Sequence, residues 1–365
     1  MSDIIIAIGT RPEIIKMAPI IRELMHRNRP FKIVYTGQHY DYNLSLQFIE
    51  ELDLPKPEYD LKVKETSPGS QTGRIIIGFE KIIKKERPLI TLVEGDTNSV
   101  LATALASNKQ KVTLGHVEAG LRSFDLRMPE EHNRRLVDHI SDYLFAPTEN
   151  ARRNLEREGV WGKIHVTGNT VVDACQQHLP IAEEKSTIME KMNFDEYLLA
   201  TVHRAENVDD ARVLRNFVEV FMAAPLPVVL PAHPRTVKRL RQAKLWRRAS
   251  SSKNLFILPA VGYLDFLLLM KNCRMILTDS GGIQEEATVP SIRKRVLVLR
   301  LSTERPEAVE TGFAKVIGVE KDTILKAIDE MMNGEPLPNE SPYGDGHSGE
   351  RITDIVLREI YPQTA

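Results

Sequence analysis

Four carboxylates between residues 96 and 131 could carry acid/base chemistry. Asp96 in EGDTNS and Glu118 in HVEAGLRS each close an apolar run, and Glu130 and Glu131 follow in MPEEHNRR. When two or three carboxylates share a partly dry cleft, their pKa values are driven apart, so one group takes a proton and another returns it. The pattern predicts a proton-transfer site in this part of the chain.

The segment MPEEHNRR also has a purely structural interpretation. A proline in the first helical turn and acidic residues near the positive end of the helix dipole are typical of a helix start. Arg134 and Arg135 on the same helix could neutralise the acids or bind an anion.

The opening stretch IIIAIGTRPEIIK indicates a strand, a glycine turn and a helix. Gly9 permits close backbone approach, Thr10 could cap the helix, and Arg11 and Lys16 could reach anionic oxygens at the helix start. The second and third glycines of a dinucleotide fingerprint are missing, so no nicotinamide cofactor is expected. A capped helix with solvated charges is the structural alternative.

A second strand-to-helix turn lies in TDSGGIQEEA. The pair Gly281 and Gly282 after Ser280 would let backbone amides approach a diphosphate, and Glu286 could bind both hydroxyls of a ribose. Acids near a helix start explain Glu285 and Glu286 without a ligand, but they do not explain the paired glycines. We therefore predict nucleotide binding here.

Two histidines also follow apolar strands, His203 in TVHRAEN and His233 in PAHPRT. A histidine at a strand end can donate a hydrogen bond to a phosphate or a sugar hydroxyl. A metal site is the alternative, because His116 and Glu118 alternate onto one strand face. No HExxH, paired cysteines or other ligand cluster accompanies them, so we expect no metal.

These residues follow strands that alternate with helical patterns along most of the chain. Short continuous apolar runs between helices predict parallel strands buried on both faces, hence an α/β fold with right-handed crossovers. We predict two Rossmann-like doubly wound domains, residues 1–175 and 176–346, with a final helix at about 347–361 that could pack back on the first domain. In such sheets ligands bind outside the carboxyl ends of the strands.

Composition sets the remaining limits. With 365 residues, two domains are expected, and 49 Lys+Arg against 50 Asp+Glu argue against a nucleic-acid or membrane partner. Only Cys175 and Cys273 are present, which favours a reducing compartment. No apolar run is long enough for a transmembrane helix, so we expect a cytoplasmic protein.

The motifs together resemble the non-hydrolysing UDP-N-acetylglucosamine 2-epimerases. The resemblance lies in GTRPEIIKMAPII, TGQHYD, GDTNSVLATALA, HVEAGLRSFD, MPEEHNRRLVDHISDYLFAPTE, GNTVVDA, TVHRAEN, TDSGGIQEEA and TERPEAVETG, which cover most of the chain in order. It implies the two-domain architecture of the B-type glycosyltransferases, with a cleft between the domains. It also implies a homodimer and no cofactor.

The family interconverts UDP-N-acetylglucosamine and UDP-N-acetylmannosamine by eliminating UDP to 2-acetamidoglucal and adding it back. Breaking the anomeric bond creates positive charge on the sugar and negative charge on UDP, which carboxylates and cations stabilise respectively. Carried over, the resemblance implies catalytic roles for Asp96, Glu118, Glu130 and His203. The substrate-binding candidates are Arg11, Lys16, Arg134, Phe266, Ser280, Gly281, Gly282, Glu286 and Arg305, with Phe266 beside uracil or in the core.

The sequence departs from the family at two places. Arg293-Lys294-Arg295 stands where many members have Gly-Lys-Pro, and YDYNLSLQF differs from the bacterial pattern. Bacterial members bind a second substrate molecule as an activator, for which Gln38 and His233 are the candidates here. Three alternatives remain: an epimerase of a modified UDP-2-acetamido sugar, a B-type UDP-sugar glycosyltransferase, and a non-catalytic UDP-sugar sensor.

Overall fold

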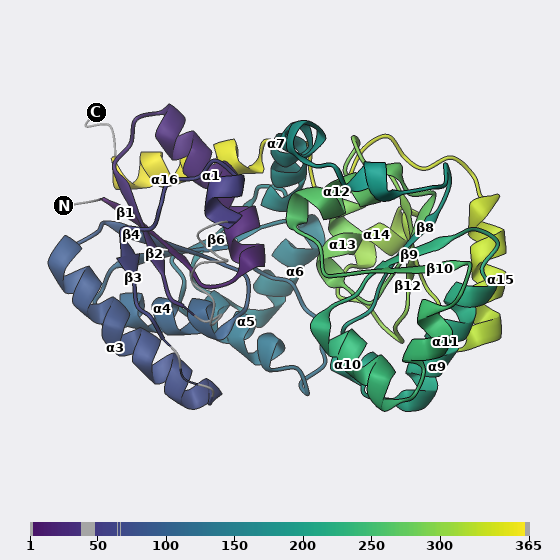
Figure 1. The fold of residues 1–365 in the computed structure, drawn as a ribbon. Helices are drawn as coiled ribbons and strands as arrows, with labels where there is room; N and C mark the ends of the chain where they lie inside the picture. The colour runs from purple at the N-terminus through teal and green to yellow at the C-terminus, as the bar shows by residue number, and fades with distance from the viewer. Residues whose placement is uncertain (1–2, 38–47, 64, 66, 362–365) are drawn as a thin grey trace. The chain divides into compact units, whose positions relative to one another are not determined.

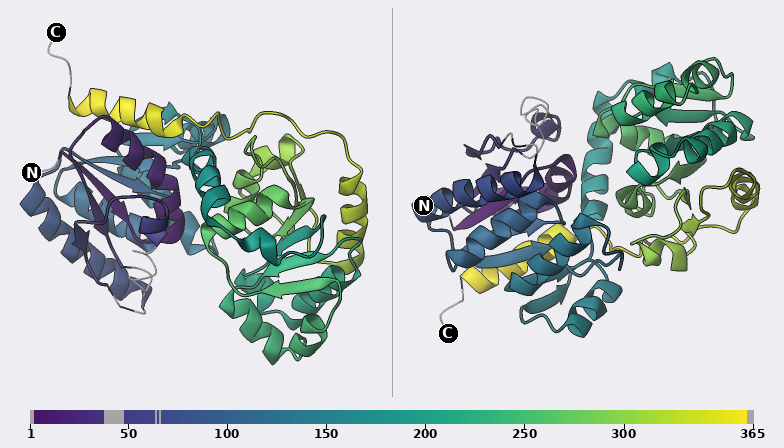
Figure 2. Two further views of the ribbon diagram at one scale, coloured as in Figure 1. Left: turned by 45° about the horizontal axis from the view of Figure 1, so that its top comes forward. Right: turned by 90° about the horizontal axis from the view of Figure 1, so that it is seen from below.

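A computed structural model describes residues 3–37, 48–63, 65 and 67–361, so Gln38 lies outside the described residues. The chain divides into two compact units (Figures 1 and 2). The first unit is Met1–Ala174 with Gly344–Ala365, and the second is Cys175–Tyr343. The sequence analysis placed the boundary between two domains at residues 175 and 176. That these domains fold independently stays a prediction.

The first unit is built on a parallel seven-stranded sheet in the order β3-β2-β1-β4-β5-β6-β7. Its strands are β1 (Ile4–Ile8), β2 (Phe31–Tyr35), β3 (Tyr59–Asp60), β4 (Ile90–Glu94), β5 (Thr113–Val117), β6 (Tyr143–Ala146) and β7 (Lys163–Val166). Every residue of β1 and β4 is buried, as expected for central strands covered on both faces.

Helices cover both faces of this sheet. They are α1 (Arg11–His26), α3 (Pro68–Glu86), α4 (Asn98–Lys109), α5 (Pro129–Ile140), α6 (Glu149–Glu158), the start of α7 (Thr170–Lys185) and α16 (Ser348–Ile360). Figure 1 shows α1 and α16 on one face and α3, α4 and α5 on the other. The final helix α16 packs against α1, where a Cβ added to Gly349 would lie 2.8 Å from the Pro19 Cβ.

The second unit repeats the same order with six parallel strands, β10-β9-β8-β11-β12-β13. The strands are β8 (Leu198–Thr201), β9 (Val228–Pro231), β10 (Leu255–Leu258), β11 (Met275–Thr278), β12 (Arg295–Val298) and β13 (Ala314–Val316). The helices are η1 (Ile188–Lys191), α8 (Ala205–Val208), α9 (Ala211–Ala223), α10 (Pro234–Gln242), α11 (Trp246–Ser250), α12 (Tyr263–Asn272), α13 (Gly281–Glu286), α14 (Pro306–Glu310) and α15 (Lys321–Met332).

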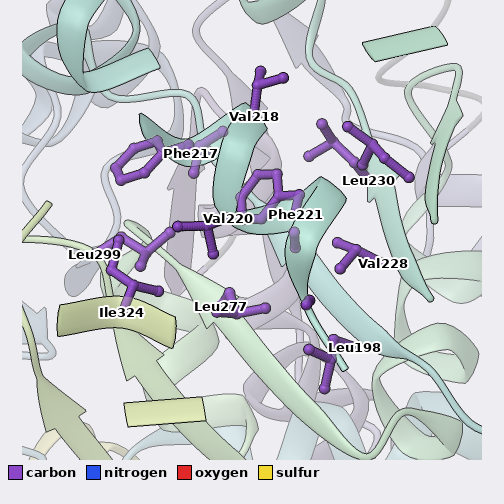
Figure 3. Close-up of a cluster of buried hydrophobic side chains, with 14 of the residues drawn as sticks. Leu198, Phe217, Val218, Val220, Phe221, Val228, Leu230, Leu277, Leu299 and Ile324 are labelled. Atoms are coloured by element: carbon purple, nitrogen blue, oxygen red, sulfur yellow. The ribbon is translucent and has the colours of Figure 1, made fainter. Parts of the chain in front are cut away.

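The core of the second unit lies between this sheet and helices α9 and α15 (Figure 3). Phe217 and Phe221 of α9 are fully buried and stack with ring centroids 6.2 Å apart. They belong to one cluster with Leu277 of β11 and Ile324 of α15. Burial of these aromatic rings supplies much of the hydrophobic stabilisation that holds α9 on the sheet.

The prediction of two doubly wound parallel sheets is confirmed. The short apolar runs that predicted strands form them, and among the described residues the sequence pattern missed only the two-residue strand β3. In both units the strand order reverses beside the first strand, between β1 and β4 and between β8 and β11. Ligands of such sheets bind at this switch point, so the loops after these four strands are the places to examine. Among the described residues, no helix is both long and apolar enough to cross a bilayer.

Replacing Phe217 tests the packing of this second core. We expect Phe217→Ala to lower the free energy of unfolding of the second unit by about 3–5 kcal/mol, because it leaves a cavity beside Phe221. Urea unfolding would be followed by fluorescence of Trp246 in a Trp161→Phe background, since one tryptophan lies in each unit. The control is Leu301→Ala, whose side chain is 88% exposed and should change stability by less than about 0.5 kcal/mol. Equal losses in the two variants would contradict the prediction.

Candidate functional site

The turn after β1 is held by the protein's own side chains. A Cβ added to Gly9 would lie 2.2 Å from Ser99 Oγ and 2.4 Å from Thr36 Oγ1. These two hydroxyls are hydrogen-bonded to each other at 2.7 Å and leave no room for a side chain. The glycine is therefore required by packing at the switch point, whether or not a ligand also approaches it.

Glu13 joins the two loops of this switch point, and the sequence analysis did not single it out. Its carboxylate accepts hydrogen bonds from the Gly9 amide at 2.6 Å, the Thr10 hydroxyl at 2.9 Å and the Thr97 hydroxyl at 2.8 Å. The side chain is buried, and burial raises its pKa to about 7 although these three hydrogen bonds lower it. Thr10 was expected to cap the helix through its side chain, but its hydroxyl is turned to Glu13 instead. The spacing T-x-x-E from Thr10 to Glu13 is a capping-box signature that could have revealed the contact.

Lys16 lies among carboxylates at the same edge of the sheet. Its ammonium is 3.3 Å from Glu94 Oε1 and forms an ion pair with Glu118, which also accepts a hydrogen bond from Asn169 at 3.2 Å. Burial raises the pKa of Glu94 well above its usual range, although Lys16 opposes this, and the nearby charge of Glu118 raises it further. The structure thus brings together Lys16, a predicted substrate-binding residue, and Glu118, a predicted acid/base residue, and it adds Glu94.

The backbone of Glu118 is strained. Its φ is +67°, in the left-handed region that a residue with a side chain seldom adopts. The residue directly follows β5 and turns its carboxylate toward Lys16 and Asn169. Strain of this kind is retained where the surrounding contacts fix an unfavourable conformation, often at functional sites.

Asp96 is joined to Arg134 of α5. Arg134 Nε donates to Asp96 Oδ2 at 3.1 Å, and Arg134 Nη1 donates to Glu131 at 3.0 Å. Glu131 is fully buried, but hydrogen bonds from Ser123 and the charge of Arg134 outweigh the effect of burial and lower its pKa. Asp96, Arg134 and Glu131 therefore form one charged network beside the turn after β4.

Glu130 is not part of this network. The side chain is exposed in the first turn of α5, and the structure gives it no hydrogen bond or ion pair with a described residue. Of the two adjacent glutamates, the structure uses Glu131 to organise the network, whereas the sequence analysis named Glu130 as catalytic. Arg11 is also exposed, with its guanidinium 4.7 Å from the ring centre of Phe48.

His116 is explained by the fold. Its Nδ1 lies 2.7 Å from Asp138 and its Nε2 lies 2.8 Å from the Gly95 carbonyl oxygen, so both ring nitrogens are occupied. Burial would raise the pKa of Asp138, but His116 and Arg122 outweigh it and lower the pKa. In the part of the chain that the structure describes, no group of three or more histidine, cysteine or carboxylate side chains is placed to hold a metal ion.

In the second unit, Asp279 joins the two loops of the switch point. This buried carboxylate accepts hydrogen bonds from the backbone amides of His203 and Arg204, both at 3.0 Å, and from Asn207 at 3.1 Å. The His203 ring has its Nδ1 3.3 Å from Asp279 and is 43% exposed, so it is both anchored and accessible. Its ring centre is 6.3 Å from that of His233, whose pKa is lowered by burial and by the charge of His203.

The two adjacent glycines after β11 differ in their surroundings. A Cβ added to Gly281 would lie 2.5 Å from Glu304 Oε1, whereas one added to Gly282 would meet no atom within 4 Å. A side chain at position 281 would therefore have to displace the Glu304 carboxylate, which Arg204 and Arg300 hold, whereas position 282 has free space. Ser280, which precedes them, makes no side-chain cap of α13.

The cations of this second cluster are paired internally. Arg305 Nε lies 2.6 Å from Glu285, and Arg204 donates to Glu304 at 3.1 Å. Burial would raise the pKa of Glu304, but the charges of Arg305, Arg300 and Arg204 lower it to about 2. Glu286 is buried in α13, and Phe266 is half-buried in α12.

Two parallel α/β units, each with a polar cluster at the switch point of its sheet, define a B-type glycosyltransferase-like architecture. The structure of MurG from Acinetobacter baumannii supports this fold, with a TM-score of 0.58 at 10% identity over 98% of this chain and all of that one. The family model for UDP-N-acetylglucosamine 2-epimerase matches residues 22–357, and the chain belongs to this family.

Two relatives are similar along nearly the whole chain. The UDP-N-acetylglucosamine 2-epimerase of Methanocaldococcus jannaschii is 48% identical over 98% of this chain and 99% of its own. Its crystal structure in complex with UDP-GlcNAc and UDP superposes with a TM-score of 0.88, covering 97% of this chain and 99% of that one. The UDP-2,3-diacetamido-2,3-dideoxy-D-glucuronate 2-epimerase of Pseudomonas aeruginosa is 37% identical over 97% of this chain and 99% of its own.

Neutralising Glu13 tests its unusual protonation. Its pKa is about 7 in the folded protein against 4.5 ordinarily, so the folded state holds an extra proton between these values. This contribution to stability is complete below pH 4.5 and is lost as pH rises to about 7, an effect of up to about 3 kcal/mol. We therefore expect the stability difference between wild type and Glu13→Gln to be larger at about pH 5 than at about pH 8.

Urea unfolding of the first unit, followed by Trp161 fluorescence in a Trp246→Phe background, would measure this difference. The matched control is Glu23→Gln, because Glu23 lies ten residues farther along the same helix and pairs with Arg27. The raised pKa of Glu13 would be contradicted by a difference in free energy of unfolding between wild type and Glu13→Gln that is the same at both pH values.

Proposed function

We propose that the protein interconverts UDP-N-acetylglucosamine and UDP-N-acetylmannosamine. In the forward direction a base removes the C2 proton while the anomeric C–O bond breaks, which releases UDP and leaves 2-acetamidoglucal. Re-addition of UDP with protonation on the opposite face of C2 gives the epimer. The observation that carries the proposal is the cluster of Lys16, Glu94 and Glu118 beside Asp96 and Arg134, in a chain of this family.

In this proposal the first unit supplies the acid/base groups and the second unit binds the nucleotide. Asp96, Glu118 and Glu130 are the acid/base candidates, and Lys16 and Arg134 stabilise negative charge while it moves during the reaction. The ion pair with Lys16 supports a charged Glu118, and exposure leaves Glu130 accessible to a substrate. His203 would steer the diphosphate or sugar, which its accessible ring supports.

In the second unit, Ser280, Gly281 and Gly282 would bind the diphosphate, and Glu286 the ribose. The free space at Gly282 supports this assignment, because the protein itself does not require a glycine there. Arg11 and Arg305 are further anion-binding candidates, and Phe266 would lie beside uracil. His233 is the remaining candidate for an activator site, and its ring lies near that of His203.

A cytoplasmic location and a homodimer complete the proposal. The two cysteines support the location, because both are free and buried in the described structure. The homodimer is proposed because it is the oligomeric state that the family resemblance implies.

An epimerase of a modified UDP-2-acetamido sugar is the second candidate function. The similarity to the diacetamido-glucuronate epimerase favours it over a glycosyltransferase or a UDP-sugar sensor. The same carboxylates would serve either epimerase, since the bond changes at C1 and C2 are the same. Turnover of the two UDP-sugars distinguishes these two epimerases.

Proton NMR in deuterated water tests the reaction itself. With UDP-N-acetylglucosamine and no added acceptor or cofactor, we expect the manno epimer to form with deuterium at C2. Asp96→Asn, Glu118→Gln and Glu130→Gln should each lower kcat by about a hundred-fold or more, the usual effect of losing a general acid or base. The exposed Glu310→Gln serves as the control and should be unaffected.

Binding without epimerisation or exchange would exclude this substrate. The experiment would then be repeated with UDP-2,3-diacetamido-2,3-dideoxyglucuronate and with candidate acceptors. Turnover of the first supports the modified-sugar epimerase, and turnover that requires an acceptor supports a transferase. Binding with no turnover in any mixture supports a sensor.

The two glycines provide a separate test of the nucleotide assignment. Gly282→Ala should fold normally, because its Cβ has free space, yet it should weaken UDP binding by about ten-fold, because the methyl group would occupy the approach of the diphosphate. Gly281→Ala should instead lower stability, because its Cβ would collide with Glu304. Calorimetric titration with UDP and thermal unfolding would measure the two effects. Wild-type affinity in Gly282→Ala would remove this turn from the nucleotide site.

A further inference from the structure

A group of cations lies at the amino ends of the strands of the second sheet. Arg274 directly precedes β11, and Arg293-Lys294-Arg295 leads into β12. Met275 and Arg295 are register partners, so the residues before them come from neighbouring strands. This is the edge opposite to the one that carries Ser280, because all strands of the sheet run in parallel.

These four cations line a pocket of about 140 Å³. Its other walls are Cys273, Met275, Met331, Met332 and Leu337. No carboxylate lines the pocket, and among the residues that the structure describes none forms an ion pair with any of these four cations. The pocket therefore combines positive charge with space for a small molecule.

The three arginines have structural partners that leave most of their donors unused. Arg274 donates to the Met332 carbonyl at 3.3 Å, Arg293 to the Leu337 carbonyl at 2.6 Å, and Arg295 to the Glu335 carbonyl. These bonds fasten the chain after α15 to the edge of the sheet. A guanidinium has five N–H donors, so each arginine keeps further donors for a ligand.

Lys294 has no such structural partner. Its side chain is half-buried, and among the described residues the ammonium has no hydrogen-bond or ion-pair partner. Burial lowers its pKa, and the positive charges of Arg274 and Lys271 lower it further, while Cys273 opposes them. A half-buried ammonium beside other cations is unfavourable unless an anion neutralises it.

A larger pocket of about 450 Å³ shares Arg295, Met331 and Leu337 with the first. Pro336 and Pro338 form part of its wall, and Lys315 adds another cation. The carboxylate of Glu330 in this wall is paired with Lys315 at 2.8 Å, and Glu335 also lines the pocket. This second space could take an uncharged part of a ligand whose anionic group sits at Lys294.

We propose that Lys294, Arg274, Arg293 and Arg295 form a binding site for a phosphoryl group or free phosphate. Four cations without an opposing carboxylate around a small pocket suit a multivalent oxyanion, and arginine forks match its oxygen geometry. The site is separate from the switch point of the same sheet by the full length of a strand. It does not depend on the proposed epimerase activity.

Calorimetric titration of the full-length protein tests this site. No nucleotide is added, because the diphosphate of UDP could itself occupy this site, and ionic strength is held constant with sodium chloride. Inorganic phosphate should bind to wild type, and Lys294→Gln should weaken this binding about ten-fold, the effect of losing one charged hydrogen bond. The control Lys253→Gln removes an exposed lysine outside the pocket and should bind phosphate as wild type does.

Arg293→Gln provides a second variant in case Lys294→Gln does not fold, and it should also weaken binding. A parallel titration with glucose 1-phosphate separates the two sources of the anion. Tighter binding than inorganic phosphate supports a phosphorylated organic ligand, and equal or weaker binding supports free phosphate. Wild-type phosphate binding in both variants, or no binding to wild type beyond that in the chloride control, would overturn the proposal.

Discussion

One buried carboxylate at each switch point joins loops that the sheet topology separates. At a switch point the chain leaves two neighbouring strands in opposite directions, so the loops after them diverge. In the first unit Glu13 connects the amide after β1 to the hydroxyl after β4, and in the second Asp279 connects the turn after β11 to two amides after β8. Asp96, His203 and Ser280 lie in these same loops. Their positions therefore depend on the hydrogen bonds that these two carboxylates accept.

The cations around the candidate sites are also held by carboxylates of their own unit. Lys16, Arg134 and Arg305 are each bound to a carboxylate of their own unit in the described structure. A buried cation needs such a partner in the absence of a ligand, since an unpaired charge in a low-dielectric environment is costly. An anionic substrate at these groups would have to share the cations with Glu118, Glu131 or Glu285. Loss of one carboxylate would therefore change both the local structure and the charge available to the ligand.

The fold was largely readable from the sequence because strand and helix signals are local. A continuous apolar run such as IIIAI or PLITLVEGD predicts a buried strand without information from the rest of the chain. Strand β3 has only two residues and no such pattern. Asp96, Glu118 and His203 lie within two residues of the end of a strand, as the apolar runs before them indicated, and their catalytic roles stay predictions. Glu94 and Asp279 were not selected, because their partners are distant in sequence, and Glu13 was missed although its T-x-x-E spacing with Thr10 is local. The difference between Glu130 and Glu131 depends on which side of α5 faces the sheet, which the pair of identical letters does not determine.

Charge is distributed differently at the two edges of the second sheet, although the whole chain has a formal net charge of only −1. At the carboxyl edge, Arg305 and Arg204 are bound to carboxylates, so their charges are largely balanced. At the amino edge, Arg274 and Arg293 are bound to backbone carbonyls, which carry only partial negative charge. A carbonyl satisfies a donor but does not neutralise a cation, so the charges of Arg274 and Arg293 are less balanced than those of Arg204 and Arg305. In a parallel sheet, the residues that precede the strands all lie at the amino edge. The basic residues before β12 therefore place their positive charge at the edge opposite the switch point.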